Sequence, residues 1–209
     1  MIKLLLVDDH SIFRSGIREM LETESDIKVM AEAGTSVEAL ISAKKQKFDI
    51  AVLDISLPDS SGLDLTKKLI RAHPEIKILM LSSYDESVYG LRSLKLGASG
   101  YLTKDCSIEV LIYAIRKVAA GSKYISLELS EKIAQLFGNK GVANHEELSS
   151  REFEVFRMIV QGISLVKIAE KLHLSSNTVK TYRTRILSKL DLKDNSELIS
   201  YAVANNLLT

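Results

Sequence analysis

Short apolar runs alternate with segments of helical period through the first half of the chain. The apolar runs are Lys3 to Val7, Ile27 to Ala31, Ile50 to Leu53, Ile76 to Leu81 and Gly100 to Leu102. The segments between them place apolar residues three or four apart, as amphipathic helices do. These segments are Ser11 to Glu22, Ser36 to Lys47, Leu63 to Ala72, Ser87 to Leu96 and Ser107 to Ala120. The alternation predicts an α/β domain over 1–121, with a parallel sheet covered by helices on both faces.

The second half of the chain has a different pattern, because strand signals disappear after residue 144. Residues 122–144 contain the amphipathic segment LELSEKIAQLF and then GNKGVAN, which together predict a linker with a short helix. Four helices are then expected, over Ser149 to Gln161, Ser164 to Leu172, Ser175 to Leu190 and Ser196 to Asn205. Ser149 and Glu152 have the spacing of a capping box. We therefore expect a separate all-α domain over 145–209.

Composition narrows the class of protein without indicating a partner. Of the 209 residues, 46% are hydrophobic, which is enough for two packed cores, and the formal net charge is only +1. Cys106 is the single cysteine, so an intrachain disulfide is impossible, which fits a reducing compartment. The apolar stretch Ile2 to Val7 is too short to span a membrane. We expect a cytoplasmic protein without a membrane partner.

Acidic residues follow two of the predicted strands. Asp8 and Asp9 come after the first strand and Asp54 after the third. The carboxyl ends of parallel strands meet at one edge of the sheet, so the three carboxylates should share a pocket and need a cation such as Mg²⁺. The fourth strand leads to Ser82 and the fifth to Lys104. Such a set suits phosphoryl transfer onto a carboxylate, with an aspartate as the nucleophile.

Two other interpretations fit part of this pattern. Aspartates are common at strand ends and helix N-caps, so each acid taken alone could be structural. Phosphohydrolases of the haloacid dehalogenase type also use an aspartate nucleophile, Mg²⁺, serine and lysine. They usually carry Asp-x-Asp at the nucleophile, whereas here Ser56 stands two residues after Asp54 and leaves no second acid. We therefore expect a phosphoryl acceptor and not an enzyme with turnover.

The segments LLLVDDH, AVLDISLPDSSG, ILMLSS and GASGYLTKD resemble, in this order, the receiver domain of bacterial two-component response regulators. The resemblance implies a flavodoxin-like sheet of order 2-1-3-4-5 and phosphorylation by a sensor histidine kinase. It implies that Asp54 is the phospho-acceptor and that Mg²⁺ is held by Asp8, Asp9, Asp54 and the backbone carbonyl of Ser56. It further implies that Ser82, Tyr101 and Lys104 contact the phosphoryl group or switch with it. A cis peptide after Lys104 is also implied, although no proline follows.

A basic helix is predicted within a nearly neutral domain. Residues 145–209 hold 9 basic and 8 acidic residues, yet SSNTVKTYRTRILSKL, at 175–190, holds four basic residues and no acidic one. Its apolar positions Val179, Tyr182, Ile186 and Leu190 form one stripe that should face the core. The preceding helix joins it through the short turn HLS, which is helix-turn-helix geometry. A solvated charged helix and a protein-binding surface remain alternatives.

The segment ELSSREFEVFRMIVQGISLVKIAEKLHLSSNTVKTYRTRILSKLDL resembles the LuxR-type DNA-binding domain. With the receiver, it resembles the NarL/FixJ class of response regulators. Tyr182 and Arg185 stand where that family usually has histidine and asparagine. The candidate DNA-binding residues are Ser176, Asn177, Thr178, Lys180, Thr181, Arg183, Thr184, Arg185 and Lys189. The resemblance matches Lys180, Thr181 and Thr184 to base-reading positions, while the flanking Arg183, Arg185 and Lys189 suit phosphate contacts.

The expected function is a phosphorylation-controlled, DNA-binding transcriptional regulator. Its expected partners are double-stranded DNA, a sensor histidine kinase, RNA polymerase and, after phosphorylation, a second copy of the chain. The added charge should draw Ser82 and Lys104 inward, with Tyr101 following. The last helix, within LISYAVANNLL, is a candidate dimer face, and packing on the core of its own domain is the alternative.

Overall fold

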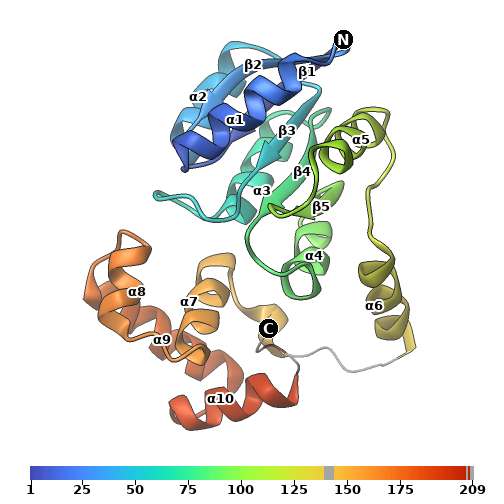
Figure 1. The fold of residues 1–209 in the computed structure, drawn as a ribbon. Coiled ribbons are helices and arrows are strands. Elements are labelled where there is room, and N and C mark those ends of the chain that lie inside the picture. Colours follow the sequence, from blue (N-terminus) through green and yellow to red (C-terminus); the bar gives the residue numbers. More distant parts are fainter. Residues whose placement is uncertain (139–143, 206, 208–209) are drawn as a thin grey trace. The chain divides into compact units, whose positions relative to one another are not determined.

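The computed structural model describes residues 1–138, 144–205 and 207. The chain divides into two compact units, Met1–Gly138 and Asn139–Thr209 (Figure 1). No helix of the described residues combines the length and the apolar character needed to cross a bilayer.

The first unit contains a five-stranded parallel sheet. Its strands are β1 (Ile2–Val7), β2 (Ile27–Ala33), β3 (Ile50–Leu53), β4 (Lys77–Ser82) and β5 (Gly100–Thr103). They lie in the order β2-β1-β3-β4-β5, which confirms the expected topology. Strand β2 runs two residues beyond its predicted end at Ala31, because Ala33 pairs with Val7 at the end of β1.

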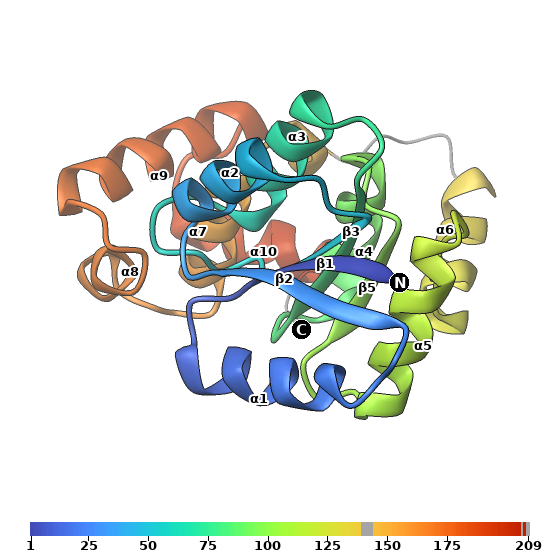
Figure 2. The same ribbon diagram turned by 90° about the horizontal axis from the view of Figure 1, so that it is seen from above.

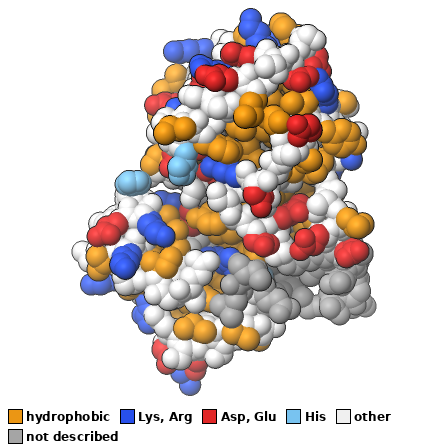
Figure 3. Space-filling model, in the orientation of Figure 1, with side chains coloured by type: hydrophobic (Ala, Val, Ile, Leu, Met, Phe, Trp, Pro, Cys, Tyr) orange, Lys and Arg blue, Asp and Glu red, His pale blue; other side chains and the backbone are white. Residues whose placement is uncertain are grey.

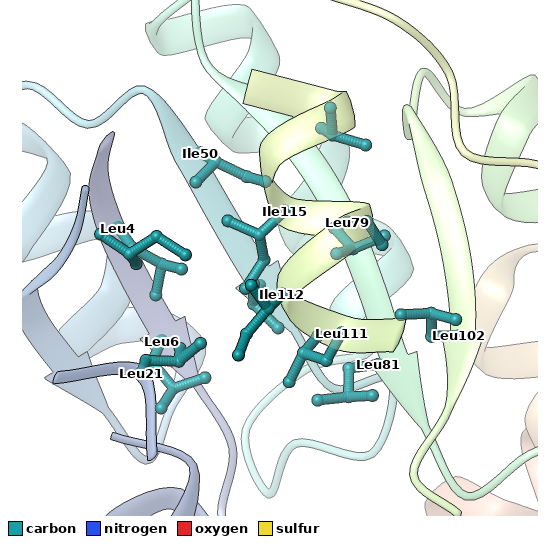
Figure 4. Packing of buried hydrophobic residues seen from close by; sticks show 14 residues of the cluster. Leu4, Leu6, Leu21, Ile50, Leu79, Leu81, Leu102, Leu111, Ile112 and Ile115 are labelled. Atoms are coloured by element: carbon teal, nitrogen blue, oxygen red, sulfur yellow. The ribbon is translucent and has the colours of Figure 1, made fainter. Parts of the chain in front are cut away.

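Five helices alternate with these strands. They are α1 (Ser11–Glu22), α2 (Ser36–Lys45), α3 (Gly62–Ala72), α4 (Glu86–Lys95) and α5 (Ile108–Ala119). Helices α1 and α5 lie on one face of the sheet, and α2 and α3 on the other (Figure 2). On the first face, side chains from all five strands form one apolar cluster with Leu111, Ile112 and Ile115 of α5 (Figure 4). Each leucine or isoleucine removed from water there contributes roughly 2 kcal/mol of transfer free energy. This core fixes the edge of the sheet at which the acidic residues emerge.

The connection from β3 to α3 is tightly closed. The Gly62 N–H donates to the Ile55 carbonyl at 2.8 Å, and an isolated bridge pairs Ser56 with Ser61. A Cβ at position 62 would lie 1.9 Å from the Asp54 carbonyl oxygen, so the backbone contact requires glycine. Helix α3 therefore begins in contact with the backbone of Asp54, the candidate phospho-acceptor.

Asp59 fastens the same loop to α2. Its carboxylate accepts hydrogen bonds from the Ser36 N–H at 2.8 Å, the Ser36 hydroxyl at 2.7 Å and the Val37 N–H at 3.0 Å. A carboxylate at the first turn of a helix satisfies unpaired N–H groups and is stabilised by the helix dipole. These bonds outweigh the effect of burial and lower the pKa of Asp59.

Helix α6 (Leu127–Gly138) belongs to the first unit. The Tyr124 N–H donates to the Ser99 carbonyl at 2.8 Å, and Tyr124 forms a parallel bridge with Gly100 of β5. Leu129 of α6 is 1% exposed and contacts Gly90 of α4. The short helix expected within the linker at 122–144 is thus packed on the α/β unit. Residues 139–143 of that linker lie outside the described residues.

The second unit is helical. It contains the 3₁₀ turn η1 (Asn144–Glu147) and helices α7 (Ser150–Val160), α8 (Leu165–Lys171), α9 (Ser176–Leu190) and α10 (Asn195–Ala204). Side chains of Ser149, Ser164, Ser175 and Asp194 cap the four α-helices. The capping box predicted for Ser149 and Glu152 is present. The rings of Phe153 and Phe156 on α7 lie 5.9 Å apart, and Tyr201 of α10 packs edge-on against Phe156.

Candidate functional site

Acidic side chains from two loops meet at the carboxyl edge of the sheet. Asp8 and Asp9 follow β1 and Asp54 follows β3, and these strands are neighbours in the sheet. Asp8, Asp9, His10 and Asp54 each place a potential ligand atom within 4.8 Å of the others. Asp8 and Asp54 are 2% and 3% exposed, whereas Asp9 and His10 lie at the surface. The structure therefore brings the three predicted carboxylates into one cluster.

Lys104 neutralises part of this cluster. Its Nζ lies 2.6 Å from Asp8 Oδ2 and 2.7 Å from Asp54 Oδ2, and 4.8 Å from the centre of the Phe13 ring. The lysine follows β5, and its N–H donates to the Ser82 carbonyl at 2.9 Å, so the sheet directs it towards the pocket. One ammonium group thus connects the acids of two different strand ends.

Burial and charge oppose each other in this pair. Burial disfavours the ionised carboxylate and raises the pKa of Asp54, although the Lys104 ammonium and the Ser82 hydroxyl act in the other direction. Burial also disfavours charged Lys104, but Asp54 and Asp8 outweigh it and raise the pKa of the ammonium. The pair thus strengthens the hold of Lys104 on its proton, whereas burial makes the charged form of Asp54 less favourable than in water. A desolvated nucleophile beside a fixed cation is typical of a reactive site.

A second group of residues surrounds the pocket. The Ser56 N–H donates to Asp54 Oδ1 at 3.3 Å, and the Ser56 and Tyr84 hydroxyl oxygens are 3.2 Å apart. The Tyr101 hydroxyl donates to the Tyr84 carbonyl at 2.7 Å, and Tyr101 is fully buried. Burial raises the pKa of Tyr101, which keeps its hydroxyl a donor. Ser82 is also buried, and its Oγ accepts the Tyr84 N–H at 3.4 Å. Tyr84, which sequence reasoning missed, joins the predicted switch residues.

Two further details differ from the sequence-based expectations. No cis peptide bond occurs among the described residues, so the peptide after Lys104 is trans. Asp105 follows, and trans is favoured by about 3 kcal/mol when the second residue is not proline. His10 is not among the predicted site residues, yet its Nδ1 lies 2.8 Å from Asp9 Oδ1. Its position directly after the Asp8-Asp9 pair was the available signal.

The donor set suits a hard divalent cation. The cluster offers several carboxylate oxygens, and hard cations such as Mg²⁺ bind through oxygen ligands. In this structure the Lys104 ammonium supplies the positive charge between Asp8 and Asp54. The ligand atoms of these two buried carboxylates lie within 4.8 Å of each other, and the positive charge offsets their repulsion.

Helix α9 presents a polar face to solvent. Val179, Ile186 and Leu190 are at most 3% exposed, as the predicted stripe requires, while Tyr182 is half-buried. The exposed residues of the predicted set are Ser176, Asn177, Lys180, Thr181, Thr184, Arg185 and Lys189, and Thr178 is half-buried. The hydroxyls of Thr181 and Thr184 donate to carbonyls one turn earlier, at 3.0 and 3.1 Å.

Two of the predicted phosphate contacts are engaged within the second unit. Lys189 Nζ lies 2.6 Å from Glu152 Oε2 and donates to the Glu147 carbonyl at 3.2 Å. Arg183 Nε donates to Asn195 Oδ1 of α10 at 2.8 Å. These bonds hold α9 to the start of α7 and to α10. Glu152 lies 37 residues before Lys189 in the sequence, and nothing in the helical period indicated this pairing.

Comparison with known proteins agrees with this geometry. Residues 4–116 match the family described as "Response regulator receiver domain", and residues 146–202 match "Bacterial regulatory proteins, luxR family". The response regulator GacA of Pseudomonas syringae is 37% identical, over 100% of this chain and 98% of its own. The response regulator UvrY of Escherichia coli is 35% identical, over 99% and 96%.

Solved structures extend the likeness to both units. Response regulator ChrA, from a heme-sensing two-component system, shares 33% identity at a TM-score of 0.54, over 99% of this chain and 98% of its own. RcsB of Salmonella enterica serovar Typhimurium, solved on promoter P1flhDC with a phosphomimetic, shares 26% identity at a TM-score of 0.59, over 96% and 97%. The chain belongs to the two-component response regulators, in the NarL/FixJ class that joins a receiver to a LuxR-type DNA-binding domain.

Proposed function

We propose that Asp54 accepts a phosphoryl group from the phosphohistidine of a sensor kinase, and that this acceptance controls DNA binding by the second unit. One observation carries the proposal: the buried Asp54 carboxylate, whose pKa is raised, contacts the protonated Lys104 ammonium. A desolvated nucleophile can attack a phosphorus atom, and the cation beside it then offsets the added negative charge.

The transfer requires little beyond positioned charges. An Asp54 carboxylate oxygen attacks phosphorus, the phosphorus–nitrogen bond to the kinase histidine breaks, and the histidine nitrogen keeps the electron pair. Asp8, Asp9, Asp54 and the Ser56 carbonyl would hold a Mg²⁺ ion, which when bound offsets the negative charge of the phosphoryl oxygens. Lys104 would exchange its contact with Asp54 for a phosphoryl oxygen, and the Ser82 hydroxyl would donate to another.

A single transfer fits the pocket better than sustained turnover. A hydrolase of this chemistry needs a general acid close to the nucleophile, and Ser56 stands in the position where haloacid dehalogenase-type enzymes carry that acid. The proposed partners are a sensor histidine kinase, double-stranded DNA and RNA polymerase, and the proposed location is the cytoplasm. Multiple turnover of generic phosphate esters would contradict this part of the proposal.

Phosphoryl incorporation tests the assignment of Asp54 directly. With Mg²⁺ and acetyl phosphate, the parent chain should gain one phosphoryl group by intact-protein mass spectrometry, and Asp54→Asn should gain none. Asp64→Asn is the matched control, because Asp64 lies in the first turn of α3 and pairs with Lys67. Chelation of Mg²⁺ should stop incorporation, since the pocket acids would then repel the phosphodonor. Unchanged incorporation into Asp54→Asn would show that the acceptor lies elsewhere.

On α9, we propose that Lys180, Thr181 and Thr184 face the bases and that the exposed Arg185 contacts a DNA phosphate. Ser176, Asn177 and Thr178 lie at the amino end of the helix, where backbone N–H groups favour anions. Arg183 and Lys189 flank the reading strip, and their bonds to Asn195 and Glu152 support a role in holding α9.

Two substitutions separate base reading from phosphate binding. Lys180→Ala should cost roughly 1–3 kcal/mol on the preferred site and relax base choice. Arg185→Ala should weaken binding to all sequences and lower the salt slope by about one. Affinities for cognate and random duplexes over a salt series distinguish the two. Equal losses on both duplexes for both variants would show that the reading face is misassigned.

A dimer is proposed because operators with two half-sites require two-fold proteins. On α10, Leu198 and Ala202 pack into the core, but Ile199 and Val203 are 40% and 54% exposed. In the first unit, apolar side chains gather on the α1 and α5 side (Figure 3), where Met20 and Tyr113 are exposed. Sedimentation of the phosphorylated chain on a palindromic duplex should give two chains per duplex, and a one-to-one complex would argue against the dimer.

A further inference from the structure

An irregularity in strand β2 decides which face of the sheet Glu32 points to. The register between β1 and β2 shifts by one residue after Leu4, so that Met30 is an extra residue in β2. As a result, Glu32 pairs with Leu6, a core residue on the face covered by α1 and α5. Side chains alternate between the two faces of a strand, so without Met30 the Glu32 side chain would point to the opposite face. The Gln46 amide donates to the Met30 carbonyl at 3.2 Å and holds the irregularity in place.

The Glu32 carboxylate pairs with two arginines of α1. Arg14 and Arg18 are one helical turn apart, so their side chains lie on the same face of the helix. Glu32 Oε1 lies 3.0 Å from Arg18 Nη1, and Glu32 Oε2 lies 3.4 Å from Arg14 Nε. The Arg14 and Glu32 side chains are only 18% and 26% exposed, so salt screens this pair less than a surface pair. The carboxylate therefore fixes the direction in which the Arg14 guanidinium extends.

The same Arg14 guanidinium reaches the loop that carries the pocket acids. Its Nη1 donates to the backbone carbonyl of Asp8, the residue that follows β1. Because a peptide unit is planar, a group that holds this carbonyl also sets the plane of the peptide that leads into Asp9. The Asp8 N–H donates to the Ala33 carbonyl at 3.0 Å. Strand β2 thus fixes both backbone groups of Asp8, directly through Ala33 and indirectly through Glu32 and Arg14.

We infer that Arg14 is a positioning residue for the metal site, which holds the backbone of Asp8 and Asp9 in the arrangement that a divalent cation requires. Glu32, directed to this face by the extra residue in β2, holds Arg14. The inference rests on the proposed binding of Mg²⁺ by these acids. Mg²⁺ accepts little deviation from octahedral geometry, so a small displacement of one carboxylate weakens its binding. Groups that orient metal ligands typically contribute a factor of about ten to a hundred in metal affinity.

Calorimetric titration of the full chain with MgCl₂, without a phosphodonor, tests this role. Arg14→Met should raise the dissociation constant for Mg²⁺ by about tenfold. Arg18→Met is the matched control and should leave the constant close to that of the parent, because Arg18 pairs with the same carboxylate while the bond to the Asp8 carbonyl comes from Arg14. Equal constants for the two variants would overturn the inference. A parent chain that does not bind Mg²⁺ would instead contradict the proposed function.

A double-mutant cycle tests whether Glu32 acts through Arg14. Glu32→Gln should weaken Mg²⁺ binding less than Arg14→Met does, because the bond to the Asp8 carbonyl remains. The variant that carries both substitutions should bind Mg²⁺ as Arg14→Met does, since residues that act through one contact are not additive. Additive losses would show that Glu32 reaches the pocket by another route and would overturn its assigned part.

The magnesium requirement of phosphoryl transfer separates positioning from a general loss of structure. With acetyl phosphate, Arg14→Met should need about ten times more Mg²⁺ for half-maximal incorporation on Asp54, while the maximal rate should change less. Arg14→Lys is a milder second variant, because an ammonium lacks the planar fork that spans Glu32 and the Asp8 carbonyl, and it should show the same shift at smaller size. A lower maximal rate with an unchanged Mg²⁺ requirement in both variants would overturn the inference.

Discussion

Each unit contains a lysine paired with a buried carboxylate, and the two carboxylates differ in the direction of their pKa shift. In the first unit, Lys104 lies between Asp8 and Asp54, and burial raises the pKa of Asp54. In the second, burial of Glu152 is outweighed by hydrogen bonds from Lys189 and Ser149, which lower its pKa. Glu152 is satisfied by the partners that complete a helix cap, whereas Asp54 lacks enough partners to repay its burial.

The direction of the pKa shift distinguishes a carboxylate in a candidate functional site from one in a structural ion pair. A carboxylate with a lowered pKa stabilises the fold, because its charged form is better solvated by the folded protein than by water. A carboxylate with a raised pKa costs stability, and that cost is retained where the charge has a task. The same residue types, a lysine and an acid, thus form a candidate functional site in one unit and a link between two helices in the other.

Removal of the two lysines should show the largest contrast. Lys104→Met leaves two buried acids in contact and should lower the stability of the first unit by about 3 kcal/mol in EDTA. Lys189→Met should cost the second unit about 1 kcal/mol or less, because the lysine side chain is 39% exposed and its ion pair is screened. Urea unfolding followed by hydrogen exchange of peptides from each unit gives both values.

Magnesium sharpens this test. Addition of Mg²⁺ should recover part of the loss in Lys104→Met, since the pocket acids regain a positive partner. It should leave Lys189→Met unchanged. Equal losses in the two units, or a magnesium effect on both variants, would remove the distinction between the pairs.

The pH dependence should run in opposite directions for the two carboxylates. At neutral pH, Asp54→Asn should be more stable than the parent by about 1 kcal/mol, because it removes a costly charge. As the pH falls through the raised pKa, folded Asp54 takes a proton and the difference begins to shrink, and it closes only as the pH reaches the ordinary value of 3.8, where the unfolded chain is protonated too. Glu152→Gln should be less stable by about 1 kcal/mol. The stability deficit of Glu152→Gln should persist as the pH falls to 4.5, the ordinary pKa of this carboxyl, and should disappear only at lower pH.

Unfolding free energies of both variants and the parent between pH 3 and pH 7 measure these windows. Glu19→Gln and Glu22→Gln, at exposed positions of α1, provide surface controls in the first unit. A parent whose stability relative to Asp54→Asn does not change with pH would mean that the Asp54 carboxylate is not disfavoured by folding.

The smallest effect concerns the salt dependence of DNA binding. Each phosphate contact contributes about 0.9 to the slope of log affinity against log salt. Arg185→Met should reduce the slope by about that amount. Lys189→Met should reduce it by much less, because its ammonium is already bonded to Glu152. A full unit lost from the slope in Lys189→Met would restore the assignment of this lysine as a phosphate contact.

Sequence patterns predict the sheet and the pocket well for a physical reason. Apolar runs such as Ile50–Leu53 contain no polar side chain that would have to face water. They are therefore expected to be strands buried on both faces of the sheet. Parallel pairing then brings the residues after neighbouring strands together, and Asp8 and Asp54 follow β1 and β3. Their proximity is a consequence of topology and requires no knowledge of side-chain packing.

Contacts between surfaces far apart in sequence were less predictable. The helical period of 127–137 indicated an amphipathic helix but not which surface would cover its apolar side. The clue was Gly90, a glycine inside a helix, which marks the close approach of another segment. The period of α9 likewise predicted Val179 and Ile186 in the core, but the bond from Lys189 to Glu152 depends on how α7 and α9 cross.

The bonds from Asp59 to α2 have a consequence for the speed of phosphorylation. They fix the tip of the loop that carries Ser56, while the Ser56–Ser61 bridge and the Gly62 contact close its base. The entropy of ordering this loop is thus lost during folding and not when the phosphodonor arrives. The loop is therefore already ordered when the phosphodonor binds. Encounter with the kinase, and not rearrangement of this loop, would limit the rate of phosphorylation.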